Sequence, residues 1–167
     1  AGAWGWGHVR SINFMICRVG QCTGAASDIN HFLGLARLYR ARTYYGKVQT
    51  YNDVPWYSKD LQTTDEEELY KTQDPRALVV DSIMADLDFA VTHMKDGNSK
   101  TKIYKVVALF EQARIALNEG TFRKYHPELG LNDYDKYLQL AVKASQAIMD
   151  NYNYKISTAA SGAMPPY

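Results

Sequence analysis

Four aromatic side chains stand out as residues that could recognise a ligand: Trp4, Trp6, Trp56 and Tyr57. The first two occur in the sequence AWGWGH, and the other two directly follow a proline. Flat apolar rings stack on the C–H faces of sugars, while polar side chains hydrogen-bond the hydroxyl groups. Aromatic residues that bind a ligand in this way are often on loops that a rigid scaffold holds in place. These four residues are therefore the candidate ligand-binding residues, with the alternative that the tryptophans of WGWG close one end of a helical stack.

The sequence carries no recognisable catalytic or metal-binding pattern. There is no Gly-rich phosphate loop and no nucleophile elbow. The acidic run DEEEL, residues 65–69, supplies carboxylates without an oriented partner, which is typical of a solvated stretch. We therefore expect no catalytic residue, no metal site and no cofactor. The histidines are scattered and lack a metal-type neighbour at helical spacing; they are His8, His31, His93 and His126.

Cys17 and Cys22 are the only cysteines. They have no further Cys or His at the spacing of a zinc site, so we expect a pair of buried thiols. A local disulfide remains an alternative in an oxidising compartment. Neither cysteine follows the apolar run of a signal peptide, so neither is expected to carry a lipid.

The bulk composition restricts the class of protein. A chain of 167 residues fits one ordinary domain or part of a larger one. A net charge of +1 gives no electrostatic footprint for nucleic acid. Hydrophobic residues make up 46%, enough for a packed core, but no run approaches the ~20 apolar residues of a membrane-spanning helix.

The segment from about Ser27 to Tyr51 has the pattern of a helix that is apolar on most sides. Its polar residues Asn30, Arg37, Arg40 and Lys47 fall within about 100° of one another around the helix axis. So wide an apolar surface predicts a helix sandwiched between neighbours. The helix is expected to end before Pro55, because the residue before proline disfavours helical angles.

A second helix is expected after Asp74-Pro75, which would supply an N-cap and a proline at the first helical position. Its opposite, polar face would carry Asp81 and Asp88, and Asp96-Gly97 would close it. Apolar residues recur at steps of three and four along its inner face: Val79, Val80, Ile83, Met84, Leu87, Ala90, Val91 and Met94.

Two more helices are expected. One runs from about Lys102 to Glu119 and stops at Gly120; the other follows Asn132-Asp133 and spans about Tyr134 to Asp150. Their predicted inner faces are Ile103, Val106, Val107, Phe110, Ala113 and Leu117 in the former, and Leu138, Ala141, Ser145 and Ile148 in the latter.

This layout predicts an all-α protein of antiparallel helix pairs. Aromatic-rich links at 52–74 and 120–133 separate the helices. Helix pairs that bury both flanks indicate a right-handed solenoid of the tetratricopeptide type, here in degenerate form because the links are long.

Five segments in order resemble the SusD/RagB-type nutrient-binding outer-membrane lipoproteins of Bacteroidetes. They are WGHVRSINFMI, FLGLARLYRARTYYGKVQTYNDVP, DPRALVVDSIMADLDFAV, KIYKVVALFEQARIALNEGTF and YLQLAVKASQAIMDNYNYKI. The chain departs from the family at Asn52, where glycine is usual. The residues that carry the likeness are Val9, Arg10, Asn13 and Phe14 in the first segment, Ala36, Arg37, Arg40, Ala41, Tyr51, Asp53, Val54 and Pro55 in the second, and Asp86, Leu87, Asp88 and Ala90 in the third.

The resemblance implies a non-enzymatic protein at the cell surface. It would bind a glycan or another nutrient and act with a TonB-dependent outer-membrane transporter, held to the outer membrane by a lipid anchor that lies outside this chain. Residues 1–167 would then be a single helical domain, the N-terminal to central part of a longer protein. The family adds no ligand residue to the four aromatic candidates.

Two other hypotheses remain open from the residues alone. Paired amphipathic helices also suit a tetratricopeptide-like adaptor that binds a peptide or protein partner. A helical hydrolase would instead require a cleft in which several carboxylates gather around a histidine.

Overall fold

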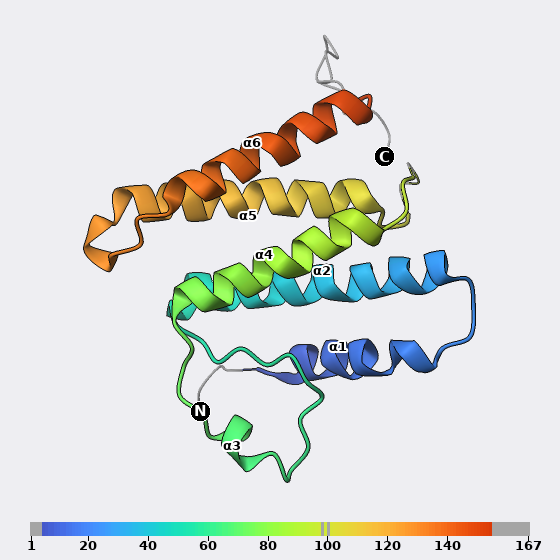
Figure 1. Ribbon diagram of the computed structural model, residues 1–167, viewed down its shortest axis with the longest axis horizontal. Helices are drawn as coiled ribbons and strands as arrows, with labels where there is room; N and C mark the ends of the chain where they lie inside the picture. Colours follow the sequence, from blue (N-terminus) through green and yellow to red (C-terminus); the bar gives the residue numbers. More distant parts are fainter. Residues whose placement is uncertain (1–4, 98, 100, 155–167) are drawn as a thin grey trace, which may run out of the picture.

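The computed structural model describes residues 5–97, 99 and 101–154, and these form six α-helices, two short 3-10 segments and no β-strand (Figure 1). The all-α prediction is confirmed. Within the same ranges, no helix is both long enough and apolar enough to cross a membrane. The elements are α1 Gly7–Arg18, η1 Val19–Gln21, α2 Ala26–Tyr51, α3 Glu66–Leu69, α4 Arg76–His93, α5 Lys105–Tyr125, η2 Pro127–Leu129 and α6 Tyr134–Asn151.

The five long helices stack in chain order, and each runs antiparallel to the one before it (Figure 1). The most extensive contacts join α2 to α4 and α5 to α6. These are two antiparallel helix pairs of the tetratricopeptide-like kind. The segment 52–75, which contains the single-turn helix α3, leaves the stack and folds back beneath α1 and α2.

Helix α2 is sandwiched between α1 and α4, as its wide apolar surface predicts. Tyr44, Tyr45 and Val48 are buried on it together with Ala41. Its polar stripe does not face solvent throughout, because the Arg40 side chain is buried between helices with only 5% of the residue exposed. A buried arginine needs charged and hydrogen-bonding partners, and their identity links the fold to the candidate site.

The chain makes a γ-turn after α2, centred on Asn52, whose φ is positive. The family that the sequence resembles usually has glycine at this position. Asn52 has φ 66° and ψ −74°, and the Asp53 N–H donates to the Tyr51 carbonyl at 2.9 Å. This conformation is strained for a residue with a Cβ. Its side chain offsets part of that strain, because Nδ2 donates to Asp53 Oδ1 and Oδ1 accepts from the Arg76 guanidinium.

Helix α4 buries the predicted apolar stripe, but its predicted cap is wrong. Arg76 is the first helical residue, and its N–H donates to Asp53 Oδ1 at 2.9 Å. The Asp74 carboxylate instead accepts the Trp56 N–H at 2.7 Å. The backbones of Val54 and Asp74 pair as an isolated antiparallel bridge, so both ends of the link are fixed together beside α4.

Helix α5 differs from its prediction in length and in orientation. It begins at Lys105 and continues to Tyr125, so Gly120 lies inside it and the link to α6 spans only 126–133. Phe110 and Leu117, assigned to the inner face, are 57% and 54% exposed. The buried face carries polar as well as apolar residues: Ala108, Leu109, Glu111, Gln112, Ile115, Ala116, Glu119, Gly120 and Arg123.

Gly120 is in the helix because α6 passes too close for a side chain. A Cβ there would lie 2.8 Å from Leu138 Cδ2 and 3.1 Å from the Leu138 backbone nitrogen. The interior glycine costs about 1 kcal/mol of helix propensity relative to alanine. The close packing of the most extensive helix contact in the protein offsets that loss.

We expect Gly120→Ala to destabilise the protein by about 1–3 kcal/mol, because overpacking against α6 outweighs the gain in helix propensity. Thermal unfolding followed by circular dichroism measures the effect. The double variant Gly120→Ala, Leu138→Ala should lose less than the sum of the two single variants. A Gly120→Ala protein more stable than wild type would show that α6 does not approach this closely.

Helix α6 ends the described stack. Ala141 is buried and the rest of its predicted inner stripe is half-buried, which confirms the orientation of this helix. Val142 and Met149 on the outer face are exposed. The prediction for the two thiols is wrong, since Cys17 and Cys22 are both exposed and unbridged at the α1–α2 end of the stack.

Candidate functional site

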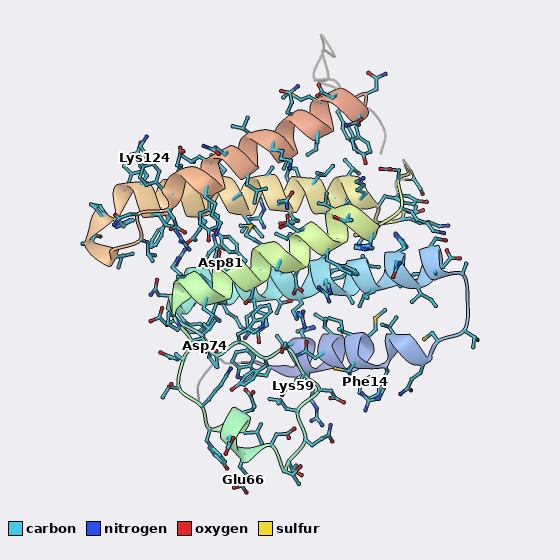
Figure 2. All side chains as sticks on the ribbon, viewed as in Figure 1. Phe14, Lys59, Glu66, Asp74, Asp81 and Lys124 are labelled. Atoms are coloured by element: carbon cyan, nitrogen blue, oxygen red, sulfur yellow. The ribbon has the colours of Figure 1, made fainter. Side chains whose placement is uncertain are left out.

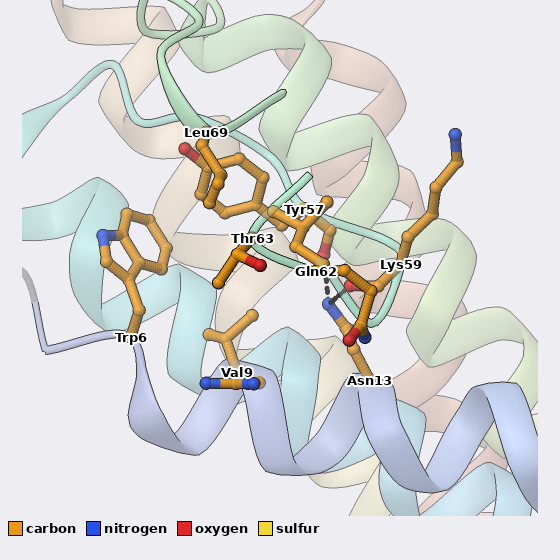
Figure 3. Close-up of a pocket in the computed structure, with 10 residues that line it drawn as sticks. Trp6, Val9, Asn13, Tyr57, Lys59, Gln62, Thr63 and Leu69 are labelled. Carbon is orange, nitrogen blue, oxygen red and sulfur yellow. Dashed lines mark hydrogen bonds between the residues drawn. The ribbon is translucent and has the colours of Figure 1, made fainter. Parts of the chain in front are cut away.

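A pocket of about 270 Å³ lies between α1 and the link 52–75. Figure 3 shows Trp6, Tyr57 and Thr63 directed into it, with Val9 entering from α1. Lys59 lies at its edge and extends its ammonium group away from the pocket. The lining residues are Trp6, Val9, Arg10, Asn13, Tyr57, Lys59, Leu61, Gln62, Thr63 and Leu69.

The pocket brings together two of the four aromatic candidates. The Trp6 and Tyr57 rings meet edge to face, with centroids 5.1 Å apart and planes at 78°. Lys47 and Lys71 place their ammonium groups over the same two rings, at 4.4 and 5.1 Å from the centroids. These cation–π contacts and the T-shaped pairing fix the orientation of both rings.

Trp56 has a different place from its neighbour Tyr57. Its ring packs on Tyr44 with the centroids 4.3 Å apart, and the Arg40 guanidinium lies 5.2 Å from its centroid. It is not among the residues that line the pocket of about 270 Å³, and it lines a minor cavity of about 20 Å³. Trp56 therefore anchors the link rather than lining the pocket, and Trp4 lies outside the described residues.

The sequence prediction missed the polar residues of the pocket. Arg10, Gln62 and Thr63 line it, and Asn13 stands at its base. The side chains of Arg10 and Thr63 make no hydrogen bond or ion pair within the described part of the chain, so both are available to bind a ligand. The only sequence signal for α1 was its likeness to the first family segment, which contains Arg10 and Asn13.

The Asp74 carboxylate secures the link that carries the aromatic residues. It accepts the Trp56 N–H, and Lys71 Nζ lies 2.9 Å from it and 2.7 Å from the Trp56 carbonyl oxygen. Burial alone would raise the pKa of Asp74. The hydrogen bond from Trp56 and the charge of Lys71 outweigh burial and hold the pKa of this carboxyl below its ordinary value.

A pKa lowered in the folded state predicts acid loosening of the link. The stabilisation by Asp74 is complete above the ordinary aspartate pKa and is lost as the pH falls through the lowered value. We expect the protection of the Trp56 amide, its exchange relative to an unstructured amide at the same pH, to decrease below that pH in wild type. An Asp74→Asn variant should show the lower protection at every pH, and a wild-type protection that does not change with pH would contradict the assignment.

The arrangement that a hydrolase requires is not seen in the described ranges 5–97, 99 and 101–154. They contain no group of three or more His, Cys, Asp or Glu side chains placed to hold a metal ion. Glu66 and Glu67 of the acidic run project from α3 into solvent. The buried Glu111 and Glu119 are both paired with arginines instead (Figure 2 shows the side chains).

A wider cleft of about 730 Å³ lies among α4, α5 and α6. Its walls are more polar than those of the first pocket, with Lys105 and Lys143 on opposite helices and Asp88 bound by Gln112 at 2.6 Å. Tyr152 is the one aromatic residue among its lining side chains, and its hydroxyl donates to Asp96. The cleft lacks the paired rings of the first pocket.

The fold is similar to that of solved SusD-like proteins. A protein crystallised with a xylogluco-oligosaccharide matches 92% of this chain at a TM-score of 0.74 and 18% identity. A laminarin-binding SusD-like protein matches 89% at 0.71 and 19% identity, and a SusD-like carbohydrate-binding protein from Bacteroides vulgatus matches 91% at 0.68 and 18%. The likeness predicted from five sequence segments is thus confirmed for the fold.

The match covers one part of those proteins. This chain spans 29%, 30% and 31% of the three matched chains. No family model and no curated protein matches the sequence. The comparisons therefore establish a SusD-like helical fold, while ligand and partners are matters of proposal.

Proposed function

We propose that this chain is the helical part of a non-enzymatic, cell-surface glycan-binding protein. Residues 1–167 would form a single domain in the N-terminal to central region of a longer protein. That protein would be held at the outer membrane by a lipid anchor and would deliver its ligand to a TonB-dependent transporter. The SusD-like fold, shared with proteins that bind xylogluco-oligosaccharide and laminarin, supports this proposal.

The single observation that carries glycan binding is the composition of the pocket between α1 and the link. It joins two fixed aromatic rings to side chains that donate hydrogen bonds, namely Arg10 and Thr63. Sugars present apolar C–H faces and hydroxyl groups on one molecule, and this combination of groups matches both. A volume of about 270 Å³ suits one or two sugar rings rather than a long chain.

The alternative function is a tetratricopeptide-like adaptor that binds a peptide. The polar cleft among α4, α5 and α6 favours it, because lysines and carboxylates on facing helices can pair with a peptide's charges and backbone. That cleft lacks stacked aromatic rings, so the two functions predict different sites on the same protein.

Glycan-array screening of the full-length protein tests the proposal. The array should contain xyloglucan and laminarin oligosaccharides together with neutral and acidic plant and microbial glycans. We expect binding to at least one glycan class. Absence of binding to every glycan, together with binding to a peptide library, would replace the proposal with the adaptor function.

A further inference from the structure

The segment Trp56–Lys59 belongs to no helix or strand, yet side chains bond most of its backbone polar groups. Asp74 accepts the Trp56 N–H at 2.7 Å, and Lys71 donates to the Trp56 carbonyl at 2.7 Å. A segment without helix or sheet partners must satisfy its backbone groups in this way when it lies partly buried. Its conformation therefore depends on a few identifiable side chains.

A buried relay reaches this segment from three helices. The Asp86 carboxylate of α4 accepts two hydrogen bonds from Arg40 of α2, at 2.6 and 2.7 Å. The Arg40 guanidinium also donates to Asn13 Oδ1 of α1 at 2.9 Å. The Asn13 amide then donates to the Tyr57 carbonyl at 2.8 Å and to the Lys59 carbonyl at 3.0 Å, as Figure 3 shows.

Asn13 lines the pocket, but its amide is committed to the relay. Both N–H donors of its side chain are used, and its oxygen already accepts from Arg40. Asn13, Arg40 and Asp86 are each less than 6% exposed, so water does not compete for these bonds. Because Arg40 and Asp86 are charged, the hydrogen bonds between them are short and directional.

Tyr44 holds the same segment from the other side. Its hydroxyl accepts the Tyr57 N–H at 2.7 Å, and its ring packs between those of Trp6 and Trp56. The residue is fully buried, and burial raises the pKa of its hydroxyl, which therefore stays protonated and neutral. The N–H and C=O of Tyr57 are thus both fixed by buried side chains from α1 and α2.

We infer that Asp86, Arg40, Asn13 and Tyr44 are positioning residues for ligand binding: they hold the backbone of Tyr57 so that its ring meets Trp6 edge to face in the wall of the pocket. The inference rests on the proposed glycan-binding function of that pocket. A ring on a mobile link would lose conformational entropy when it binds, whereas a ring fixed beforehand retains more of its binding free energy.

Asn13→Asp is the most selective test of the relay. The aspartate keeps an oxygen for Arg40 but replaces both N–H donors with a carboxylate that faces the Tyr57 and Lys59 carbonyls. Tyr44→Phe removes only the hydroxyl that accepts the Tyr57 N–H. Tyr45→Phe is the matched control, because its hydroxyl is equally buried on α2 but bonds Asn118 of α5, away from the link.

Two measurements on the full-length protein decide the inference. Amide hydrogen exchange of Trp56 and Tyr57, whose N–H groups bond Asp74 and Tyr44, should accelerate by about tenfold in Asn13→Asp and Tyr44→Phe, with α4 unchanged and Tyr45→Phe like wild type. Titration with xyloglucan and laminarin oligosaccharides should show an affinity reduced by about tenfold in the first two variants only.

The outcomes separate the inference from the function on which it rests. Unchanged exchange at Trp56 and Tyr57 in Asn13→Asp would overturn the relay. Faster exchange with unchanged oligosaccharide affinity would overturn its role in positioning the pocket. A wild-type protein that binds neither probe nor any other glycan of the array would contradict the proposed function instead, and the exchange comparison would still decide the relay.

Discussion

Replacing Glu119 with alanine is expected to destabilise the protein by about 3–5 kcal/mol, since it leaves buried charges without a partner. Glu119 is completely buried on α5 and accepts from Arg76 of α4 at 2.7 Å and from Arg123 at 2.8 Å. Arg123 also donates to Asp133 before α6 at 2.5 Å. One carboxylate thus joins α4, α5 and the turn to α6.

The expected loss corresponds to a decrease in Tm of roughly 6–20 °C for a chain of this size. Glu111→Ala is the matched control on the same helix. Its carboxylate is also buried, but its partners Arg42 and Arg114 are 65% and 45% exposed and can be hydrated when it is removed. Equal decreases in Tm for the two variants would show that the Glu119 pairing contributes nothing beyond burial.

The buried apolar stripe of α4 was predictable from the sequence. Most of the residues from Val79 to Met94 that were assigned to it are buried, whereas the buried Asp86 on the same helix was not assigned to it. For α5 and the residues just before it, the same reasoning was right only in part: Ile103 and Val107 pack against the core, but Phe110 and Leu117 are exposed. Glu119 is a core residue only because Arg76, 43 positions away, meets it in the fold, and no local pattern shows that partner.

Gly120 illustrates the same limit. A glycine near the end of an apolar pattern usually terminates a helix, and here it instead admits the side chain of Leu138 from α6. The reason lies in the distance between two helices. Spacing along one helix carries no information about that distance.

The candidate site was predictable in part. Chemistry alone selected Trp6 and Tyr57, which line one pocket, but could not separate them from Trp56, which is not among the residues that line it. The segments that resemble the SusD/RagB family contain Asn13, Arg40 and Asp86. Their connection into one relay depends on three helices meeting, which only the structure shows.

Tyr57→Ala is expected to reduce glycan affinity by about 30-fold or more, the effect of removing an aromatic residue that contributes at least about 2 kcal/mol to binding. The ring forms one wall of the pocket, and its loss also removes the partner that orients Trp6. Because Tyr57 is only partly buried, its truncation should change stability less than it changes affinity.

Calorimetric titration with the glycan identified on the array tests whether the pocket between α1 and the link is the glycan-binding site. Wild type, Tyr57→Ala and Tyr125→Ala would be compared in the full-length protein. Tyr125→Ala is the control, because Tyr125 is an exposed aromatic residue at the C-terminal end of α5 that does not line the pocket. We expect Tyr57→Ala to bind the glycan at least about 30-fold more weakly than wild type, and Tyr125→Ala to bind it like wild type. Wild-type affinity in Tyr57→Ala would contradict the assignment of this pocket as the glycan site.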